Sequence, residues 1–178
     1  MSEINDQQKY KIAFLLDVIK RYDHYIGTSN FKIGLSLSFL VTVILGLLIR
    51  FLLIEPATTN CVVYKFTTIF IILTCLASLI SIFMLLKAVS PNTSSSNDYK
   101  SLIFFGDVSS FENGEEYLQK IVGASTNDIL KDLTSQTNSV AKIVTEKFRI
   151  LKIAINIAMF AVLPLLFICI LLLILLGK

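Results

Sequence analysis

Three long apolar runs constrain this 178-residue chain more than any other feature of its sequence. Residues 66–86 and 153–176 contain no charged side chain, and residues 33–54 contain only Arg50. A helix of about 20 apolar residues crosses the hydrocarbon core of a bilayer, and an arginine near its end can reach the headgroups. We prefer this interpretation to buried helices of a soluble protein. The runs therefore predict an all-α membrane protein with three transmembrane helices, at 33–54, 66–86 and 153–176.

Little of the chain remains for any other domain. Charged residues make up 16% of it, against about 25% in ordinary soluble domains, and the part outside the apolar runs is too small for a catalytic core of its own. Homo-oligomerisation is therefore expected. The sequence contains no catalytic signature, a single histidine (His24) and three cysteines without a CxxC pair: Cys61, Cys75 and Cys169. We predict no catalytic residue, no metal site and no cofactor.

The distribution of lysine and arginine predicts the orientation in the membrane. These residues are frequent in residues 1–32 and 87–152 and absent from the loop at 55–61. By the positive-inside rule, the N-terminal segment and residues 87–152 are cytosolic, and the short loop (55–65) and the C-terminus are external. No signal peptide is expected, because the first apolar run is too long and lacks a small-residue cleavage site.

The two cytosolic segments are predicted to be mainly helical. In residues 1–32, apolar side chains at helical spacing predict an amphipathic helix over 6–26, which packs on neighbouring helices, lies on the bilayer or contacts a ligand. In residues 87–152, a polar linker (90–97) precedes an apolar Phe-Phe-Gly-Asp plug and a short helix over 110–122. A capping box at Ser125–Asp128 then starts a helix that runs directly into the third span, where Pro164 is expected to bend it.

Small and hydroxylated residues form stripes on the first two spans. In the first span, Gly34, Ser38, Thr42 and Gly46 recur every four residues and share one face. Such stripes serve either close helix packing, which is the commoner use, or a wet pathway through an oligomer. If a pathway exists, its candidate lining residues are Ser38, Thr42, Thr74 and Ser78.

The predicted cytosolic face also combines basic and aromatic side chains. Lysine and arginine bind phosphates, and aromatic rings stack on bases. Juxtamembrane lysines equally serve anionic lipids and topology, and on composition alone this second interpretation is preferred. The candidate nucleotide-binding residues are Lys32, Lys100, Phe104, Phe105, Lys147, Phe148 and Arg149.

The order of these parts resembles the Pycsar-type transmembrane effectors of bacterial antiphage defence over nearly the whole chain. Residues 30–34 look like the family's Asp-x-Lys-Ala segment, with Asn30 in place of the aspartate, and Lys147-Phe148 stands where the family usually has a Lys-Tyr pair. The other residues that carry the resemblance are Leu102-Ile103-Phe104-Phe105-Gly106-Asp107, Glu115-Glu116-Tyr117-Leu118, Asp132, Gln136 and Glu146-Lys147-Phe148-Arg149.

This resemblance implies a nucleotide-regulated effector in the bacterial inner membrane. A partner nucleotidyltransferase or cyclase encoded in the same operon makes a nucleotide or short oligonucleotide. The effector senses it and opens a pore or channel that depolarises or permeabilises the membrane, which is abortive infection. Family members work with cyclic pyrimidine mononucleotides. The alternatives are a non-conducting membrane scaffold and a toxin that disrupts lipid without a defined pore.

Overall fold

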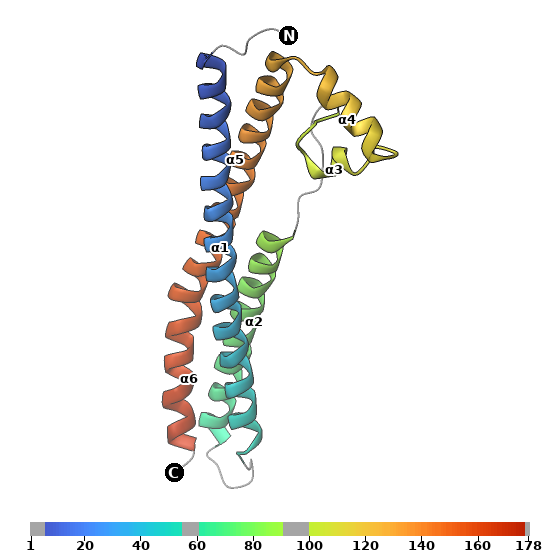
Figure 1. Ribbon diagram of the computed structural model, residues 1–178. Helices are drawn as coiled ribbons and strands as arrows, with labels where there is room; N and C mark the ends of the chain where they lie inside the picture. Colours follow the sequence, from blue (N-terminus) through green and yellow to red (C-terminus); the bar gives the residue numbers. More distant parts are fainter. Residues whose placement is uncertain (1–5, 55–60, 91–99, 177–178) are drawn as a thin grey trace. The chain divides into compact units, whose positions relative to one another are not determined.

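The structure is a computed structural model that describes residues 6–54, 61–90 and 100–176, and within these ranges it consists of helices and their connections (Figure 1). Three helices are long and apolar enough to cross a membrane, which confirms the predicted all-α class with three spans. The elements in chain order are α1 (Asp6–Leu52), α2 (Cys61–Val89), α3 (Phe105–Val108), α4 (Gly114–Gly123), α5 (Thr126–Ile157), the π-helical segment η2 (Ala158–Val162) and α6 (Leu163–Leu176).

The chain divides into two compact units. Unit 1 comprises residues 1–27 and 91–146, and unit 2 comprises residues 28–90 and 147–178. Helix α1 is unbroken across residue 32, where the sequence suggested a boundary between the amphipathic segment and the first span. Helix α2 extends beyond the predicted span at both ends. The predicted turn at Pro56 and most of the polar linker at 90–97 lie outside the described residues.

In unit 1, the first part of α1 lies beside α5. Its partly buried positions alternate at spacings of four and three, which is the pattern of a helix with one packed face: Gln8, Ile12, Leu15, Ile19 and Tyr22. The Gln8 amide donates to Asn127 Oδ1 of α5 at 3.4 Å. The predicted amphipathic helix is therefore present, and Leu133 and Val144 are among the side chains that α5 buries.

The predicted capping box at the start of α5 is confirmed. Asp128 Oδ2 accepts hydrogen bonds from the hydroxyl (2.6 Å) and the backbone N–H (3.0 Å) of Ser125, whose hydroxyl accepts the Asp128 N–H at 3.2 Å. The bond from the Ser125 side chain, together with that from its backbone, lowers the pKa of the Asp128 carboxyl. These bonds satisfy backbone groups that a helix end leaves unpaired.

Helix α4 begins four residues later than the sequence suggested. Its cap is Asn113, whose side chain accepts the Glu116 N–H at 2.9 Å. The residues before it turn instead, because Ser109 and Ser110 donate their hydroxyls to the carbonyls of Gly106 and Asp107. Serine side chains that bond nearby carbonyls in this way compete with helix formation.

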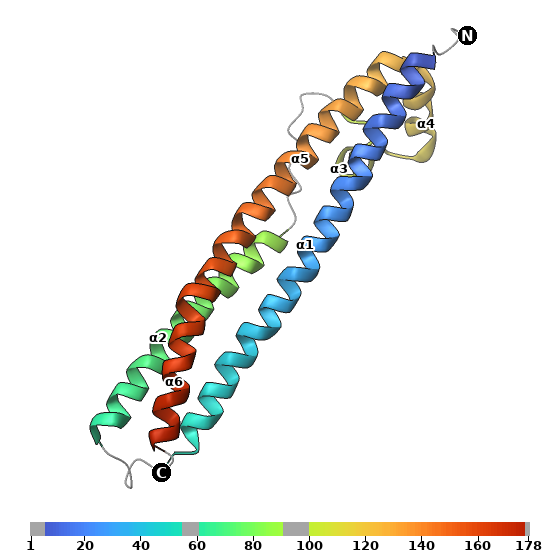
Figure 2. The ribbon, with the colours of Figure 1, turned by 90° about the vertical axis from the view of Figure 1, so that its left-hand side faces the viewer.

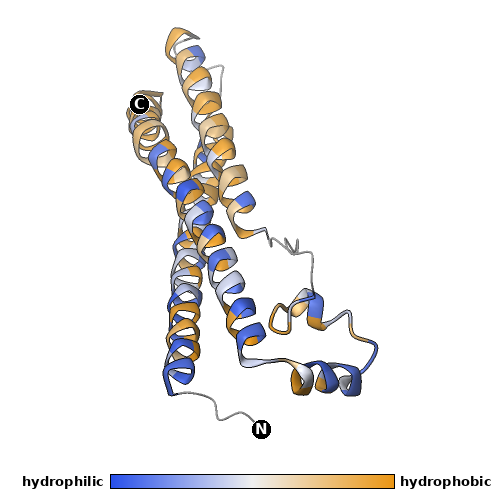
Figure 3. Ribbon diagram, turned by 90° about the horizontal axis from the view of Figure 1, so that it is seen from above, coloured by the Kyte–Doolittle hydropathy of each residue, from blue (hydrophilic) through white to orange (hydrophobic). Residues whose placement is uncertain are grey.

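Unit 2 contains the membrane-spanning parts. Helix α2 packs against η2 and α6 (Figures 1 and 2), and α1 adds the buried face of Ile33, Leu40, Val43 and Leu47. Most large apolar side chains outside this core are exposed, and Figure 3 shows the hydrophobic colours concentrated on these helices. An apolar exterior is what contact with lipid requires.

The chain accommodates Pro164 by widening the preceding turn. Pro164 has no N–H, and its ring would clash with a carbonyl of the preceding α-helical turn. Residues Ala158–Val162 are π-helical, and the Leu163 N–H bonds to Ala158 O, five residues back. The helix thus continues without a break from Thr126 to Leu176, as predicted for a cytosolic helix that runs into the third span. The π-helical segment itself was not predicted.

Candidate functional site

The segment between residues 100 and 107 in unit 1 is a tight loop whose backbone is held by side chains. The N–H of Ser101 donates to Asp107 Oδ2 (2.9 Å), and the N–H of Leu102 donates to Asp132 Oδ2 (2.8 Å). The next two N–H groups, of Ile103 and Phe104, both donate to the Ser101 hydroxyl. The predicted apolar plug is therefore a polar turn with apolar side chains.

Two further side chains tie this loop to the helices of unit 1. The Tyr117 hydroxyl of α4 donates to Leu102 O at 2.7 Å, and the Gln136 amide of α5 donates to the Ser101 hydroxyl at 3.1 Å. Tyr117, Asp132 and Gln136 belong to the sequence pattern that carried the resemblance but were not proposed as site residues. Their shared function of holding one loop depends on contacts between distant parts of the chain.

The aromatic pair of the loop is partly available to a ligand. The rings of Phe104 and Phe105 lie 4.8 Å apart, centroid to centroid, and are inclined at 52°, and Phe105 is 66% exposed. A Cβ at Gly106 would approach Phe104 Cε1 to 2.6 Å, so any larger residue here would require the Phe104 ring to shift. Lys100 lies over the Phe111 ring and donates to Ser110 O, which fixes its ammonium group beside the loop.

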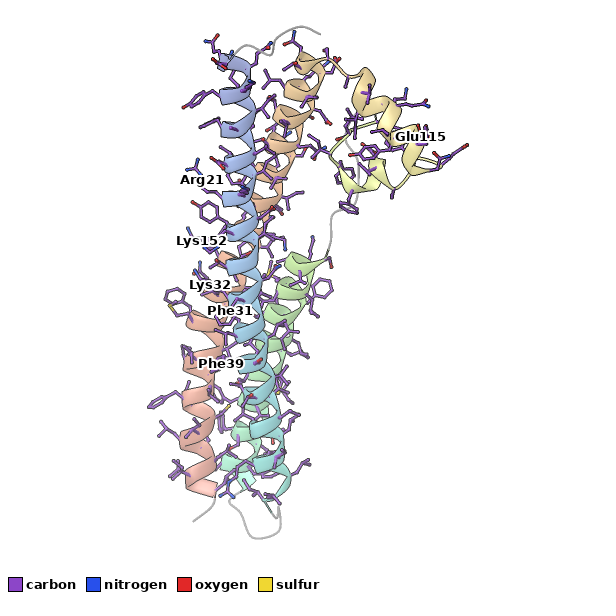
Figure 4. The ribbon with its side chains drawn as sticks, in the orientation of Figure 1. Arg21, Phe31, Lys32, Phe39, Glu115 and Lys152 are labelled. Atoms are coloured by element: carbon purple, nitrogen blue, oxygen red, sulfur yellow. The ribbon has the colours of Figure 1, made fainter. Side chains whose placement is uncertain are left out.

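The other predicted ligand residues lie in unit 2. Lys147 Nζ donates to Asn30 Oδ1 at 2.9 Å, and burial lowers the pKa of Lys147. Lys32 is exposed on α1 beside Phe31, and both project outward (Figure 4). Phe148 is 39% exposed, and Arg149 is exposed and has an interaction partner. Asn30, which belongs to a segment that carried the resemblance, thus accepts a hydrogen bond from a predicted ligand residue.

The structure assigns the seven predicted ligand residues to two sets. Lys100, Phe104 and Phe105 belong to unit 1, and Lys32, Lys147, Phe148 and Arg149 belong to unit 2. Within the described residues, no group of histidine, cysteine, aspartate and glutamate has the arrangement of a metal site.

The polar stripes of the two spans face different surroundings within the protomer. Thr74 and Ser78 of α2 are fully buried, and Thr74 Oγ1 lies 3.4 Å from Cys169 Sγ. Farther along the same face, the Ser81 hydroxyl donates to Ala154 O at 3.0 Å. This face therefore packs against the third span.

The stripe on α1 is exposed, and its Thr42 and Gly46 border an open groove between α1 and α6. Ser38 and Thr42 are exposed and donate to the carbonyls of Gly34 and Ser38, four residues earlier in their own helix. A Cβ built at Gly34 or Gly46 meets no atom within 4 Å. The small size of these residues is therefore not required by any contact within the described part of the protomer.

The comparison with known proteins assigns the family. The sequence model described as the Pycsar effector protein domain matches residues 14–175, nearly the whole chain. The searches of curated proteins and of solved structures returned no match. The chain therefore belongs to the Pycsar effector family, whose members are cyclic-nucleotide-regulated effectors of antiphage defence with transmembrane helices.

Proposed function

We propose that this effector assembles into a homo-oligomeric pore or channel of the bacterial inner membrane, which a nucleotide from a partner cyclase or nucleotidyltransferase gates. The observation that carries the proposal is the outward face of α1. Its hydroxyl-bearing positions, Ser38 and Thr42, are exposed, while the corresponding positions of α2, Thr74 and Ser78, are buried in the protomer. We therefore assign the lumen to α1 among the candidate lining residues.

The glycines on the same face support an assembly. A glycine inside a helix costs roughly 1 kcal/mol relative to alanine, and Gly34 and Gly46 have open space where a side chain would be. In membranes, small residues allow helices of neighbouring subunits to approach closely. A ring of α1 helices would bring Gly34 and Gly46 against adjacent subunits and turn the hydroxyl-bearing positions toward the axis. The alternative functions are a non-conducting scaffold and a lipid-disrupting toxin, for which this face contacts only lipid.

The two sets of basic and aromatic residues described above are proposed as two separate candidate sites for the ligand, one within each unit. Lysine and arginine supply charge-assisted hydrogen bonds to phosphate, and an exposed phenylalanine such as Phe105 offers a face on which a pyrimidine stacks. In unit 2 the Asn30 amide positions the Lys147 ammonium. Anionic lipid headgroups present the same phosphate chemistry and are the competing ligands for this set.

Both units supply cytosolic parts in the proposed topology, with residues 1–32 and 87–152 inside and the loop 55–65 and C-terminus outside. The distribution of lysine and arginine supports this arrangement. A reporter enzyme inserted at residues 94–96 is expected to be active in the cytosol, and one fused after Lys178 is expected to be active in the periplasm. Reporters that both function in the same compartment would contradict the three-span topology.

The proposed gating is tested with the wild-type chain in liposomes. We expect efflux of a trapped small ion, measured by fluorescence, to change at least tenfold when cyclic CMP or cyclic UMP is added on the side of the cytosolic segments. Liposomes loaded with a large dextran control for bilayer rupture. Efflux of ions alone supports a pore, simultaneous loss of dextran indicates lipid disruption, and an unchanged barrier under every nucleotide condition indicates a non-conducting scaffold.

A further inference from the structure

Four consecutive backbone N–H groups in unit 1, those of residues 101–104, all donate to side-chain oxygens. Their acceptors are Asp107 Oδ2, Asp132 Oδ2 and, for the last two, the Ser101 hydroxyl. Runs of successive N–H groups in a turn form concavities that bind anions such as phosphate. In this loop, carboxylate groups of the chain itself occupy two of the positions where an anion would accept hydrogen bonds.

One of these carboxylates is poorly satisfied. Asp132 is only 3% exposed. Its Oδ2 accepts the Leu102 N–H at 2.8 Å, whereas its Oδ1 has no hydrogen-bond partner among the described residues. A buried acceptor without a partner loses the hydrogen bonds that water would provide, and the cost is larger for a charged group. Burial therefore destabilises the charged side chain of Asp132, and this cost offsets part of what its hydrogen bond to the loop contributes.

We propose that the amides of residues 101–104 are the subsite for the phosphate ester of the regulatory nucleotide, and that Asp132 occupies this subsite as a built-in competitor when no nucleotide is bound. The proposal rests on the nucleotide regulation proposed above and names where the phosphate binds. A phosphate brings more acceptor oxygens than one carboxylate oxygen provides. When phosphate displaces Asp132 from the loop, the Asp132 carboxylate can become hydrated, and its unpaired Oδ1 then gains hydrogen bonds from water.

The neighbouring groups fit this use of the loop. Lys100 precedes the four amides and is fixed over Phe111, and Phe105, which follows them, is exposed for base stacking. Asp132 lies on α5, and the same helix continues into the third span. Replacing Asp132 by phosphate breaks the charge-assisted hydrogen bond that joins the loop to α5 and leaves the neutral bond from Gln136 to Ser101. Ligand binding thereby changes the restraint on the helix that crosses the membrane.

The test compares Asp132→Asn with Asp128→Asn in the full chain, purified in detergent without phospholipid. Both changes remove one negative charge from α5, but Asp128 bonds only to Ser125 in the described hydrogen-bond network. Cyclic CMP, cyclic UMP, inorganic phosphate and glycerol phosphate are titrated by calorimetry. We expect Asp132→Asn to raise the affinity for the nucleotide roughly five- to tenfold, since a bond to a charged acceptor is stronger than one to a neutral acceptor, and Asp128→Asn to change it less than twofold.

Amide hydrogen exchange of the wild-type chain provides a readout that does not depend on the variant folding. We expect bound nucleotide to slow exchange at residues 101–104 and to leave that of α4 unchanged. Nucleotide binding with unaltered exchange at 101–104, or equal gains in the two variants, would overturn the phosphate subsite while the proposed regulation stands. A wild-type chain that binds none of the nucleotides would contradict both the phosphate subsite and the proposed nucleotide regulation. A preference for glycerol phosphate over the nucleotides would assign the loop to lipid headgroups and contradict the proposal.

Discussion

Replacing Thr42 by aspartate is expected to leave the oligomer assembled and conducting and to make the conductance strongly selective for cations. Thr42 is exposed on α1 in the protomer, so a lumen-facing carboxylate at this position stays hydrated. A ring of such carboxylates attracts cations and repels anions. Reversal potentials of the purified variant in a planar bilayer, measured under a salt gradient with nucleotide present, report the selectivity directly.

Two matched variants separate this outcome from simple tolerance of a charge. Val41→Asp places the same charge on an exposed position about 100° away around the helix, on the side of Gly34, where we expect contact with a neighbouring subunit or with lipid. Ser78→Asp places it on the buried face of α2. A carboxylate in the hydrocarbon core costs on the order of 3 kcal/mol on insertion scales, so both variants are expected to lose insertion or assembly. If Thr42→Asp fails like these two, α1 does not line a lumen. If Ser78→Asp assembles and alters selectivity instead, α2 lines it.

If the phosphate binds to the unit 2 set rather than to the loop at 101–104, reversing the charge of Lys147 is expected to weaken nucleotide binding about ten- to a hundredfold, because each charge-assisted contact with phosphate contributes roughly 1.5–3 kcal/mol. The same change at Lys32 or Arg149 is expected to have a similar effect on affinity. Membrane insertion should be unchanged, since these residues precede the apolar spans on α1 and α5. Equilibrium binding of labelled cyclic CMP and cyclic UMP to the purified variants measures the effect.

Lys142→Glu is the matched control, since Lys142 is an exposed lysine of the same helix and is not among the predicted ligand residues. A second control uses pH. Burial lowers the pKa of Lys147, so wild-type affinity should fall as pH rises through a value below that of an ordinary lysine. Lys147→Arg should retain its affinity there, because arginine stays charged. Undiminished nucleotide affinity in all three charge reversals would assign these side chains to lipid headgroups. An equal loss of affinity in Lys142→Glu would indicate that the positive charge of the protein attracts the nucleotide without a specific site.

Much of the architecture was predictable because it depends on local properties of the sequence. The affinity of a segment for hydrocarbon is the sum of its own side chains, so the three spans follow from the apolar runs alone. The amphipathic face of α1 in unit 1 and the Ser125–Asp128 capping box are equally local, since each involves residues within one or two turns. The family resemblance was also present in the sequence, through short segments such as Phe104-Phe105-Gly106-Asp107, and the family comparison confirmed it.

The packed faces of the spans depend instead on contacts between residues that are far apart in the sequence. Along a span that is apolar on every side, lipid and protein interior differ little in polarity, so shape and hydrogen bonding select the packed face. Ser81 finds Ala154 O and Thr74 lies against Cys169, while the similar stripe through Thr42 faces outward. Likewise, Pro164 predicted a disturbance of the helix, but only the fold showed that this disturbance is a π-helical turn.

The candidate site shows the same division between local and tertiary information. Residue types indicated phosphate-binding and base-stacking side chains, which is a statement about chemistry that composition supports. Their distribution over two units, the bond from Lys147 to Asn30 and the orphaned oxygen of Asp132 required the fold. The sequence by itself determined which segments cross the membrane, because transfer into lipid is a property of each segment. Only the tertiary structure decided which polar groups are satisfied within the protomer, because a hydrogen bond depends on the position of both partners.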